Sequence, residues 1–210
     1  MEGCLLIGGK GPERSCLGPH IADCNLVVAA DSGLKHALRL EMEPTDIVGD
    51  FDSVDQAELS RYPNIRIHRF DRDKDDTDTE IGIKLLRERG AETIHVVGGG
   101  GGRLDHLYAI ISLFHRESAP DHWYTHREHI MLIRDRRRVR LPIGKRVSFF
   151  PVGGATCKMR TRGLKWPLDQ LSWSVGDFGI SNIVMEEEIE IDLAEGRLIM
   201  IYDLGREDRA

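Results

Sequence analysis

Two aspartates separated by a single residue are the first sign of chemistry in this chain. The segment "IVGDFDSV" (residues 47–54) places Asp50 and Asp52 on either side of Phe51, directly after an apolar run and a glycine. In an extended segment, residues two apart project to the same side, so both carboxylates would share a face while Phe51 turns inward. Like charges this close oppose each other's ionisation, so we expect a cation between them.

Other acidic segments also follow apolar runs. Asp31 comes directly after "LVVAA", the segment "DRDKDDTD" (71–78) after "IRIHRF", and "GGGGGRLD" (98–105) after "IHVV". If these runs are parallel strands, their carboxyl ends meet at one edge of a sheet, where the ligand crevice of such sheets lies. The pattern therefore predicts one acidic pocket, formed by Asp31, Asp50, Asp52, Asp78 and Asp105.

Carboxylate oxygens are hard ligands that suit Mg²⁺, which commonly binds through one or two carboxylates together with substrate phosphates. The glycines at 98–102 would let backbone N–H groups approach phosphate oxygens, and Arg103 adds a fixed positive fork. The residues alone thus predict a Mg²⁺–nucleotide or phosphoryl-transfer site.

Each of these features also has a structural interpretation. Asp31 and Asp78 could cap the helices that follow them, and the 71–78 run could be a solvated loop. The glycines could serve flexibility alone, and His106 fits a helix-surface or packing histidine. The "GGKG" at residues 8–11 matches neither the Walker A motif nor the dinucleotide fingerprint and is interpreted as a tight turn. The placement of all the acids at one edge favours the site.

Short apolar runs rich in β-branched residues alternate with helical patterns up to residue 126, which predicts a mostly parallel, Rossmann-like three-layer α/β domain. Helices are expected over 32–42, over 80–90 with a capping box from Thr77 to Glu80, and over 103–117. The last carries an apolar stripe of Leu104, Leu107, Ile111 and Phe114. The strands, continuous enough to be buried on both faces, are expected at 4–9, 25–31, 46–50, 64–70 and 93–99.

From residue 127 to 210 the pattern becomes antiparallel. Apolar and polar residues alternate in "HIMLIRDRRRVRLPIGKRVSFFPV" (129–152), and "EEIEIDLAEGRLIMIYDL" (187–204) is typical of a β-hairpin turning at Glu195 and Gly196. This half predicts a small antiparallel β-sandwich. Two closely packed domains, 1–126 and 127–210, are therefore expected.

Composition limits the class of protein. The chain has 40% hydrophobic and 30% charged residues and a formal net charge of −6, which argues against nonspecific nucleic-acid binding. Its four cysteines form no C-x-x-C pair, the start lacks the features of a signal peptide, and no stretch approaches a membrane span. We expect a cytoplasmic protein without a membrane partner.

Six segments, in order, resemble the thiamine pyrophosphokinase (thiamine diphosphokinase) family, over roughly residues 4 to 204. GDFDS alone is moderately specific, but the ordered set across both halves is highly specific. The segments are "ADSG" (30–33), "GDFDS" (49–53), "DDTD" (75–78), "GGRLDH" (101–106), "GLKWPL" (163–168) and "ISN" (180–182).

The resemblance implies transfer of the pyrophosphoryl group of ATP to thiamine, releasing AMP, by a homodimer with the active site at the subunit interface. It implies that Asp50, Asp52 and Asp78 hold Mg²⁺, and that Asp31 and Asp105 line the same pocket. Domain 1–126 would then be the catalytic ATP/Mg domain, and 127–210 the thiamine-binding and dimerisation domain. The resemblance places these residues beside ATP: Asp31, Ser32, Gly99, Gly100, Gly101, Gly102, Arg103 and His106. It places these beside thiamine: Trp166, Ser181 and Asn182.

The implied chemistry agrees with the residues. Attack on the β-phosphorus builds negative charge that Mg²⁺ and Arg103 can neutralise, and Asp105 or Asp78 could accept the alcohol proton. Thiamine is a flat cation that suits the indole face of Trp166, although outside GLKW this residue would be taken for a core tryptophan.

Three residues depart from the family pattern: Ser32 replaces a glycine, Asp76 a glutamine, and Ile183 a glutamate common in bacterial members. The Asp76 and Ile183 departures leave open a Mg–ATP pyrophosphokinase acting on a related alcohol. A non-catalytic nucleotide-binding module is a separate alternative.

Overall fold

The computed structural model describes residues 1–51, 54, 56–71, 73–169 and 171–205. The chain divides into two compact units, the first formed mainly by Met1–Ile110 and His122–Arg127 and the second by Ile111–Asp121 and Glu128–Leu204. Among the described residues, no helix combines the length and the apolar character that crossing a membrane would require.

The first unit is built on a parallel sheet, in the strand order β6-β5-β1-β2-β3-β4. Its strands are β1 (Glu2–Leu6), β2 (Cys24–Ala30), β3 (Asp46–Gly49), β4 (Arg66–Arg69), β5 (Thr93–Val97) and β6 (His122–Tyr124). Because all these pairings are parallel, the segments that follow the strands emerge at one edge of the sheet.

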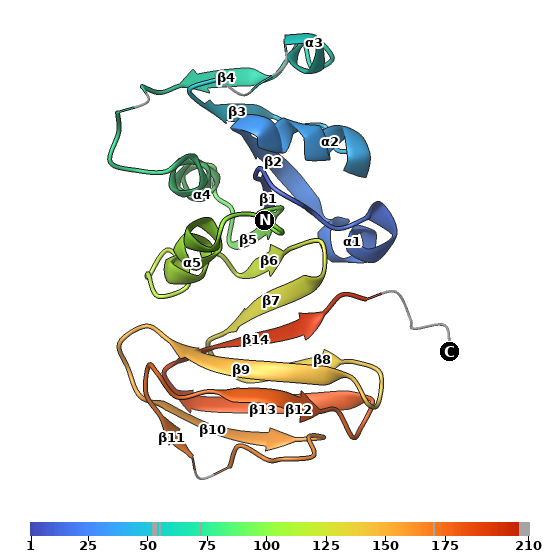
Figure 1. Cartoon of the computed structure of the whole chain (residues 1–210), viewed down its shortest axis with the longest axis vertical. Coiled ribbons are helices and arrows are strands. Elements are labelled where there is room, and N and C mark those ends of the chain that lie inside the picture. Colours follow the sequence, from blue (N-terminus) through green and yellow to red (C-terminus); the bar gives the residue numbers. More distant parts are fainter. Residues whose placement is uncertain (52–53, 55, 72, 170, 206–210) are drawn as a thin grey trace. The chain divides into compact units, whose positions relative to one another are not determined.

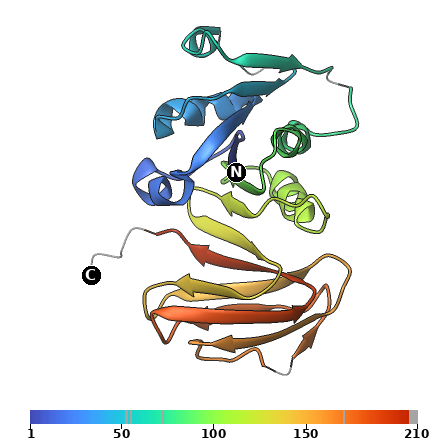
Figure 2. The same ribbon diagram turned by 180° about the vertical axis from the view of Figure 1, so that it is seen from behind.

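Helices cover both faces of this sheet. α1 (Arg14–Ile21) and α2 (Leu34–Leu40) lie on one side, and α4 (Asp78–Glu88) and α5 (Leu104–Leu113) on the other (Figures 1 and 2). A 3₁₀ turn, η1 (Asp31–Gly33), joins β2 to α2, and α3 (Gln56–Leu59) precedes β4. The three-layer α/β prediction is confirmed.

The capping box predicted for α4 is present. The Thr77 hydroxyl accepts a hydrogen bond from the N–H of Glu80, and the Glu80 carboxylate accepts one from the N–H of Thr77. Two otherwise unpaired N–H groups are satisfied in this way, so the helix start is defined locally and Asp78 occupies its first position.

Some expectations for the first unit were wrong. β4 is an edge strand with mostly exposed side chains, so it is not buried on both faces. Leu104 is 80% exposed, Leu107 and Ile111 are partly buried, and Phe114 is the one residue of the predicted stripe that is fully buried. The helix α1 and the strand β6 were not predicted. α1 carries Gly18 and Pro19 and buries Leu17 and Ile21, so tertiary packing overrides its weak helix propensity.

The second unit is the expected antiparallel sandwich. One sheet has the order β12-β9-β14-β7 and the other, four-stranded, has the order β11-β10-β13-β8. Side chains from both, including Phe149, Met159, Ile189 and Met200, share one hydrophobic core. The strands are β7 (Glu128–Ile133), β8 (Arg137–Arg140), β9 (Arg146–Val152), β10 (Cys157–Arg162), β11 (Ser172–Trp173), β12 (Gly179–Ile183), β13 (Glu188–Glu195) and β14 (Arg197–Asp203).

The hairpin expected at Glu195 and Gly196 was wrong in its pairing. The chain does turn there, at Gly196 with φ +83°, but β13 pairs with β8 and β10 whereas β14 pairs with β7 and β9. The turn therefore carries the chain from one sheet to the other. Both strands place their apolar faces against the shared core, which stabilises face-to-face packing instead of edge-to-edge pairing.

Candidate functional site

Three of the predicted acids come together at the carboxyl edge of the parallel sheet. Asp31 follows β2, Asp50 follows β3 and Asp78 begins α4. Asp31 shares a hydrogen bond with Asp78 and is repelled by the charges of both Asp78 and Asp50. Partial burial and these two interactions with carboxylates raise the pKa of Asp31 to about 7. The three carboxylates thus oppose one another's ionisation, and a bound cation would relieve this repulsion.

Glycine at position 49 permits this approach. Gly49 has φ +146°, and a Cβ atom there would lie 1.8 Å from Oδ1 of Asp31. The backbone N–H of Phe51 donates to the same oxygen at 3.3 Å. The glycine of GDFDS therefore lets the chain at the end of β3 pass close to the Asp31 carboxylate.

The extended geometry expected for 50–52 was wrong. β3 ends at Gly49, and Phe51 has φ +67°, in the left-handed region, so alternation of side chains does not continue. Phe51 is nevertheless buried, as predicted, and the guanidinium carbon of Arg69 lies 4.9 Å from its ring centroid. Asp52 lies outside the described residues, so its assignment as a metal ligand stays a prediction.

Lys74 is a member of the acid cluster that we did not anticipate. Its Nζ donates to Oδ1 of Asp78 at 2.6 Å, and only 18% of its side chain is exposed. Lys74 lies four residues before Asp78, in the run that we interpreted either as part of the acidic pocket or as a solvated loop, and we assigned no role to this lysine. A lysine ammonium already contacts one of the oxygens assigned to a metal, so this oxygen is accessible to a cation.

Asp105 and Arg103 pair with each other. Arg103 donates from Nε to Oδ1 of Asp105 at 3.1 Å and from Nη2 to Oδ2 at 2.5 Å, and both side chains are exposed. This pair and the N–H of His106 hold the pKa of Asp105 below its usual value. His106 is itself exposed in the first turn of α5. The ion pair keeps Arg103 at the end of the glycine-rich loop.

The glycine-rich loop is less open than we expected. The N–H groups of Gly98, Gly99 and Gly100 donate to the carbonyls of Tyr124, Gly8 and Lys10, respectively. These three cannot also donate to a phosphate. Gly101 and Gly102 are exposed, and their N–H groups have no hydrogen-bond partner among the described residues. Any cradle for phosphate is therefore limited to these two.

The "GGKG" segment is part of the same loop pair, which sequence reasoning missed. Lys10 and Gly100 exchange backbone hydrogen bonds of 2.7 and 2.9 Å. A Cβ at Gly101 would meet the side chain of Lys10 at 2.7 Å, so this lysine lies over the loop. Lys10 is exposed, so the fold adds a positive charge beside the glycine-rich loop that the sequence did not reveal.

Two of the departures from the family pattern are accommodated locally. A Cβ atom at position 8 would lie 2.5 Å from Oγ of Ser32. Glycine at this position therefore leaves room for the Ser32 hydroxyl. The extra carboxylate, Asp76, accepts from Nζ of Lys84 at 2.5 Å. Its charge is therefore balanced by a lysine of α4.

In the second unit, Asn182 holds the GLKW segment in place. Its Oδ1 accepts from the N–H of Trp166 at 3.2 Å and from the N–H of Ile183 at 2.9 Å, while its Nδ2 donates to the carbonyl of Trp166 at 2.6 Å. Asn182 is only 4% exposed. Its amide is thus occupied by backbone, which indicates a residue that positions Trp166.

Trp166 itself is 51% exposed, unlike a core tryptophan. The Nζ atom of Lys165 lies 4.7 Å from the centroid of its ring, so the indole already attracts a cation. Ser181 is exposed, adopts φ +58°, and donates its N–H to Oγ of Ser148 at 3.1 Å. It lies where the pairing of β12 with β9 is irregular, next to Asn182.

The donor set of the first unit fits a magnesium ion. Asp31, Asp50 and Asp78 offer only carboxylate oxygens, which are the ligands that Mg²⁺ prefers. Burial and the neighbouring carboxylates raise the pKa of Asp31, and the Lys74 ammonium donates to Asp78, so this donor set favours a bound cation.

An α/β unit of this kind binds its ligand outside the carboxyl ends of its parallel strands, and the carboxylates that converge there suit a phosphate substrate bound through Mg²⁺. Comparison with known proteins is more specific. Residues 19–123 match the family model of the thiamin pyrophosphokinase catalytic domain, and residues 128–198 match that of its vitamin B1 binding domain. The chain belongs to the thiamin pyrophosphokinase family.

Individual relatives agree with this membership. The chain is 26% identical over 190 residues to a thiamine pyrophosphokinase of Bacillus subtilis, covering 84% of this chain and 86% of the relative. It is 29% identical over 176 residues to thiamine pyrophosphokinase 1 of Oryza sativa, covering 73% of this chain but only 64% of the relative. The fold matches the crystal structure of a thiamin pyrophosphokinase from Geobacillus thermodenitrificans, with a TM-score of 0.77, 24% identity and full coverage of both chains.

Proposed function

We propose that this chain is a transferase that moves the pyrophosphoryl group of ATP to the hydroxyl of thiamine, giving thiamine pyrophosphate and AMP. The observation that carries the proposal is the cluster of Asp31, Asp50 and Asp78 at the carboxyl edge of the sheet, within a chain that matches both domains of the family. Mg²⁺ held by these acids, together with Asp52, would neutralise charge on the phosphates and orient them.

The reaction forms a bond between the thiamine oxygen and the β-phosphorus and breaks the bond from that phosphorus to the oxygen bridging to the α-phosphate. The bridging oxygen leaves with AMP, and the alcohol gives up its proton. Negative charge builds on the transferred group. The exposed side chains of Arg103, which is paired with Asp105, and of Lys10, which lies over the glycine-rich loop, would stabilise that charge.

A single assay tests the reaction. The chain is incubated with ATP, Mg²⁺ and thiamine, and the products are resolved by chromatography. We expect AMP and thiamine pyrophosphate in equal amounts. ADP formation would reject pyrophosphoryl transfer. AMP formed only with a different alcohol would support the alternative that the Ile183 departure suggested, a pyrophosphokinase acting on a related alcohol. Nucleotide binding without turnover would support the alternative of a non-catalytic nucleotide-binding module.

Thiamine is proposed to stack on Trp166. Its thiazolium cation would take the place over the indole that the Lys165 ammonium now shares. Replacing Trp166 by alanine should raise KM for thiamine about 10-fold and leave KM for ATP unchanged, because a cation on an indole face is worth about 1–2 kcal/mol. Steady-state kinetics with each substrate varied in turn measure this.

Lys165→Ala is the matched control. It removes the ammonium beside the ring but keeps the ring, so KM for thiamine should stay the same or fall. If Lys165→Ala raised KM as much as Trp166→Ala, the lysine and not the indole would be the binding group. An effect of Trp166→Ala on ATP alone would overturn the stacking assignment.

We further propose a homodimer with the active site at the subunit interface. Its support is a set of large apolar side chains of the second unit that are 51–61% exposed, more than an isolated subunit readily tolerates together. They are Trp166, Val175, Phe178, Ile180 and Met185. Sedimentation equilibrium at micromolar concentration should give twice the 23.7 kDa of one chain. A mass of one chain throughout that range would contradict the dimer.

A further inference from the structure

Strand register gathers a second set of potential ligands, at the opposite edge of the parallel sheet from the acids. Glu2 pairs with Cys24, Cys4 pairs with His95, and His95 pairs with His122. Glu2 and Cys4 are two residues apart on β1, so all five side chains project from the same face of the sheet. A carboxylate, two thiols and two imidazoles therefore lie in one row near the amino ends of four adjacent strands.

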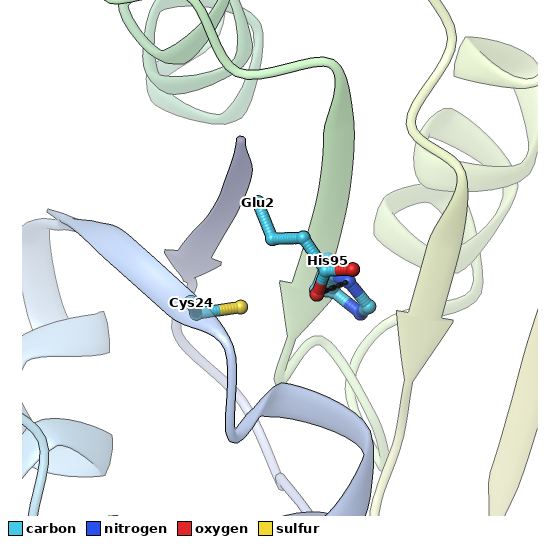
Figure 3. Close-up of side chains that lie close together, drawn as sticks. All are labelled: Glu2, Cys24 and His95. Carbon is cyan, nitrogen blue, oxygen red and sulfur yellow. Dashed lines mark hydrogen bonds and ion pairs between the residues drawn. The ribbon is translucent and has the colours of Figure 1, made fainter.

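Three of these side chains converge on a single point. One ligand atom from each of Glu2, Cys24 and His95 lies within 4.8 Å of the other two. Figure 3 shows that they come from β1, β2 and β5 and that the Cys24 sulfur is directed toward the other two groups. The Oε2 atom of Glu2 is 3.2 Å from Nε2 of His95, which is only 4% exposed.

These distances suit a tetrahedral ion with nitrogen, oxygen and sulfur ligands. Zinc–nitrogen and zinc–oxygen bonds of about 2.0–2.1 Å at a tetrahedral angle put the two ligand atoms about 3.3 Å apart. Glu2 and His95 already have this spacing, and the Cys24 sulfur, within 4.8 Å of both ligand atoms, would complete a three-residue ligand set. Thiolate and imidazole select zinc and similar transition-metal ions over Mg²⁺.

The histidine is also oriented as a ligand would be. Its other nitrogen, Nδ1, makes a 3.2 Å hydrogen bond with the hydroxyl of Tyr124, which is buried. Its ring stacks on that of His122, with 4.7 Å between centroids and 16° between planes. Outer contacts of this kind fix the tautomer and the direction of the coordinating nitrogen in metal sites.

We propose that Glu2, Cys24 and His95 bind one zinc-class divalent cation, with a solvent molecule as fourth ligand, and that this ion fastens β1, β2 and β5 at their amino ends. The site is separate from the acids that serve phosphoryl transfer, because those follow the carboxyl ends of strands. Its effect is on stability, since a ligand that binds only the folded chain raises the free energy of unfolding.

Cobalt(II) is the probe, because a thiolate ligand gives it a strong near-ultraviolet charge-transfer band that an all-oxygen site cannot. The full chain, in a thiol-free phosphine reductant, is titrated with Co²⁺ and then with Zn²⁺. We expect the charge-transfer band to saturate at one equivalent of Co²⁺ per chain. Added Zn²⁺ should displace the Co²⁺ and remove the band, and Zn²⁺ should raise the midpoint temperature of thermal unfolding. No charge-transfer band at any Co²⁺ concentration would overturn the proposal.

Single substitutions test whether the bound ion is held by the proposed ligands. Cys24→Ser should abolish the band and weaken Zn²⁺ binding at least about 100-fold, since even loss of an outer contact costs about 10–100-fold. Tyr124→Phe should keep the band but weaken binding about 10-fold or more. Cys16→Ser, a change at a cysteine outside the cluster, should alter neither. A band that survives Cys24→Ser, or is lost in Cys16→Ser, would refute the assignment.

Glu2→Gln gives a second test should Cys24→Ser fold poorly, because the Glu2 side chain is 37% exposed and its loss leaves no buried cavity. It should weaken Zn²⁺ binding at least about 100-fold while the band remains at high Co²⁺. Unchanged Zn²⁺ affinity in Glu2→Gln would contradict the proposal. Thiamine pyrophosphate formation with Mg²⁺ should be unchanged in both variants, so the zinc site and the reaction are tested separately.

Discussion

Replacing Asp78 by asparagine should lower kcat by about 10²–10³-fold without unfolding the chain. Asp78 is the acid that shares a hydrogen bond with Asp31 and receives the Lys74 ammonium, so it lies at the centre of the cluster. Asparagine keeps the shape but removes the charge that would hold the proposed cation, and loss of one preorganised electrostatic contact at a reacting phosphate has an effect of this order. Single-turnover product formation measures it.

The stability of this variant should change by less than about 1 kcal/mol. Removing a negative charge from the first turn of α4 costs about 0.3–1 kcal/mol, whereas relief of the repulsion between Asp31 and Asp78 offsets that cost. Asp76→Asn is the matched control, because it lies two residues away and pairs with Lys84. A similar fall in kcat in both variants would mean that general negative charge, and not the Asp78 position, supports turnover.

Asp46→Asn should be the most destabilising single-charge change in the first unit, by about 3–5 kcal/mol. Asp46 is 1% exposed and accepts from Nε and Nη2 of Arg66 at 3.0 and 2.9 Å and from Nη2 of Arg89 at 3.0 Å. The Nε2 atom of His68 lies 2.7 Å away. One carboxylate thus ties β3, β4 and the end of α4, and asparagine would leave several cations without their partner.

The pH dependence follows from the same contacts. Burial alone would raise the pKa of Asp46, but hydrogen bonds from Arg66, His68 and Thr45 outweigh it and hold this pKa well below its usual value. The folded state therefore binds this proton more weakly than the unfolded state. The stabilisation is present in full above pH about 4, near the pKa of an unfolded aspartate, and is lost as pH falls through the folded pKa.

Urea denaturation at several pH values tests both statements. The wild-type chain should lose stability on acidification below pH about 4 more steeply than Asp46→Asn, which lacks this group. Glu88→Gln, an exposed change one residue before Arg89, should alter the free energy of unfolding by less than about 0.5 kcal/mol. Equal stabilities of Asp46→Asn and Glu88→Gln at neutral pH would show that the Asp46 cluster contributes little.

Much of the architecture was readable from the chain because it depends on local patterns. Continuous β-branched runs, helical periodicity and the capping box of Thr77 and Glu80 act over a few residues, and each produced the expected element. Parallel pairing then makes acids that follow different strands converge, which is why Asp31, Asp50 and Asp78 were predicted together.

Long-range pairing was the part that local patterns could not supply. The apolar alternation of residues 188–203 fits a hairpin and a two-sheet crossover equally well, because both bury the same faces. Likewise, nothing local distinguishes N–H groups open to a ligand from those of Gly98, Gly99 and Gly100, whose partners are carbonyls of Tyr124, Gly8 and Lys10.

The residue types and their order determined the family, the two-part architecture and the set of acids that meet at the carboxyl edge of the sheet, since these follow from patterns carried by short segments. Tertiary structure alone decided that Lys74 contacts Asp78, that the Asn182 amide positions Trp166, and that Glu2, Cys24 and His95 meet. Each of those contacts joins atoms whose distance is set by strand register and loop conformation, and these depend on packing across the whole unit.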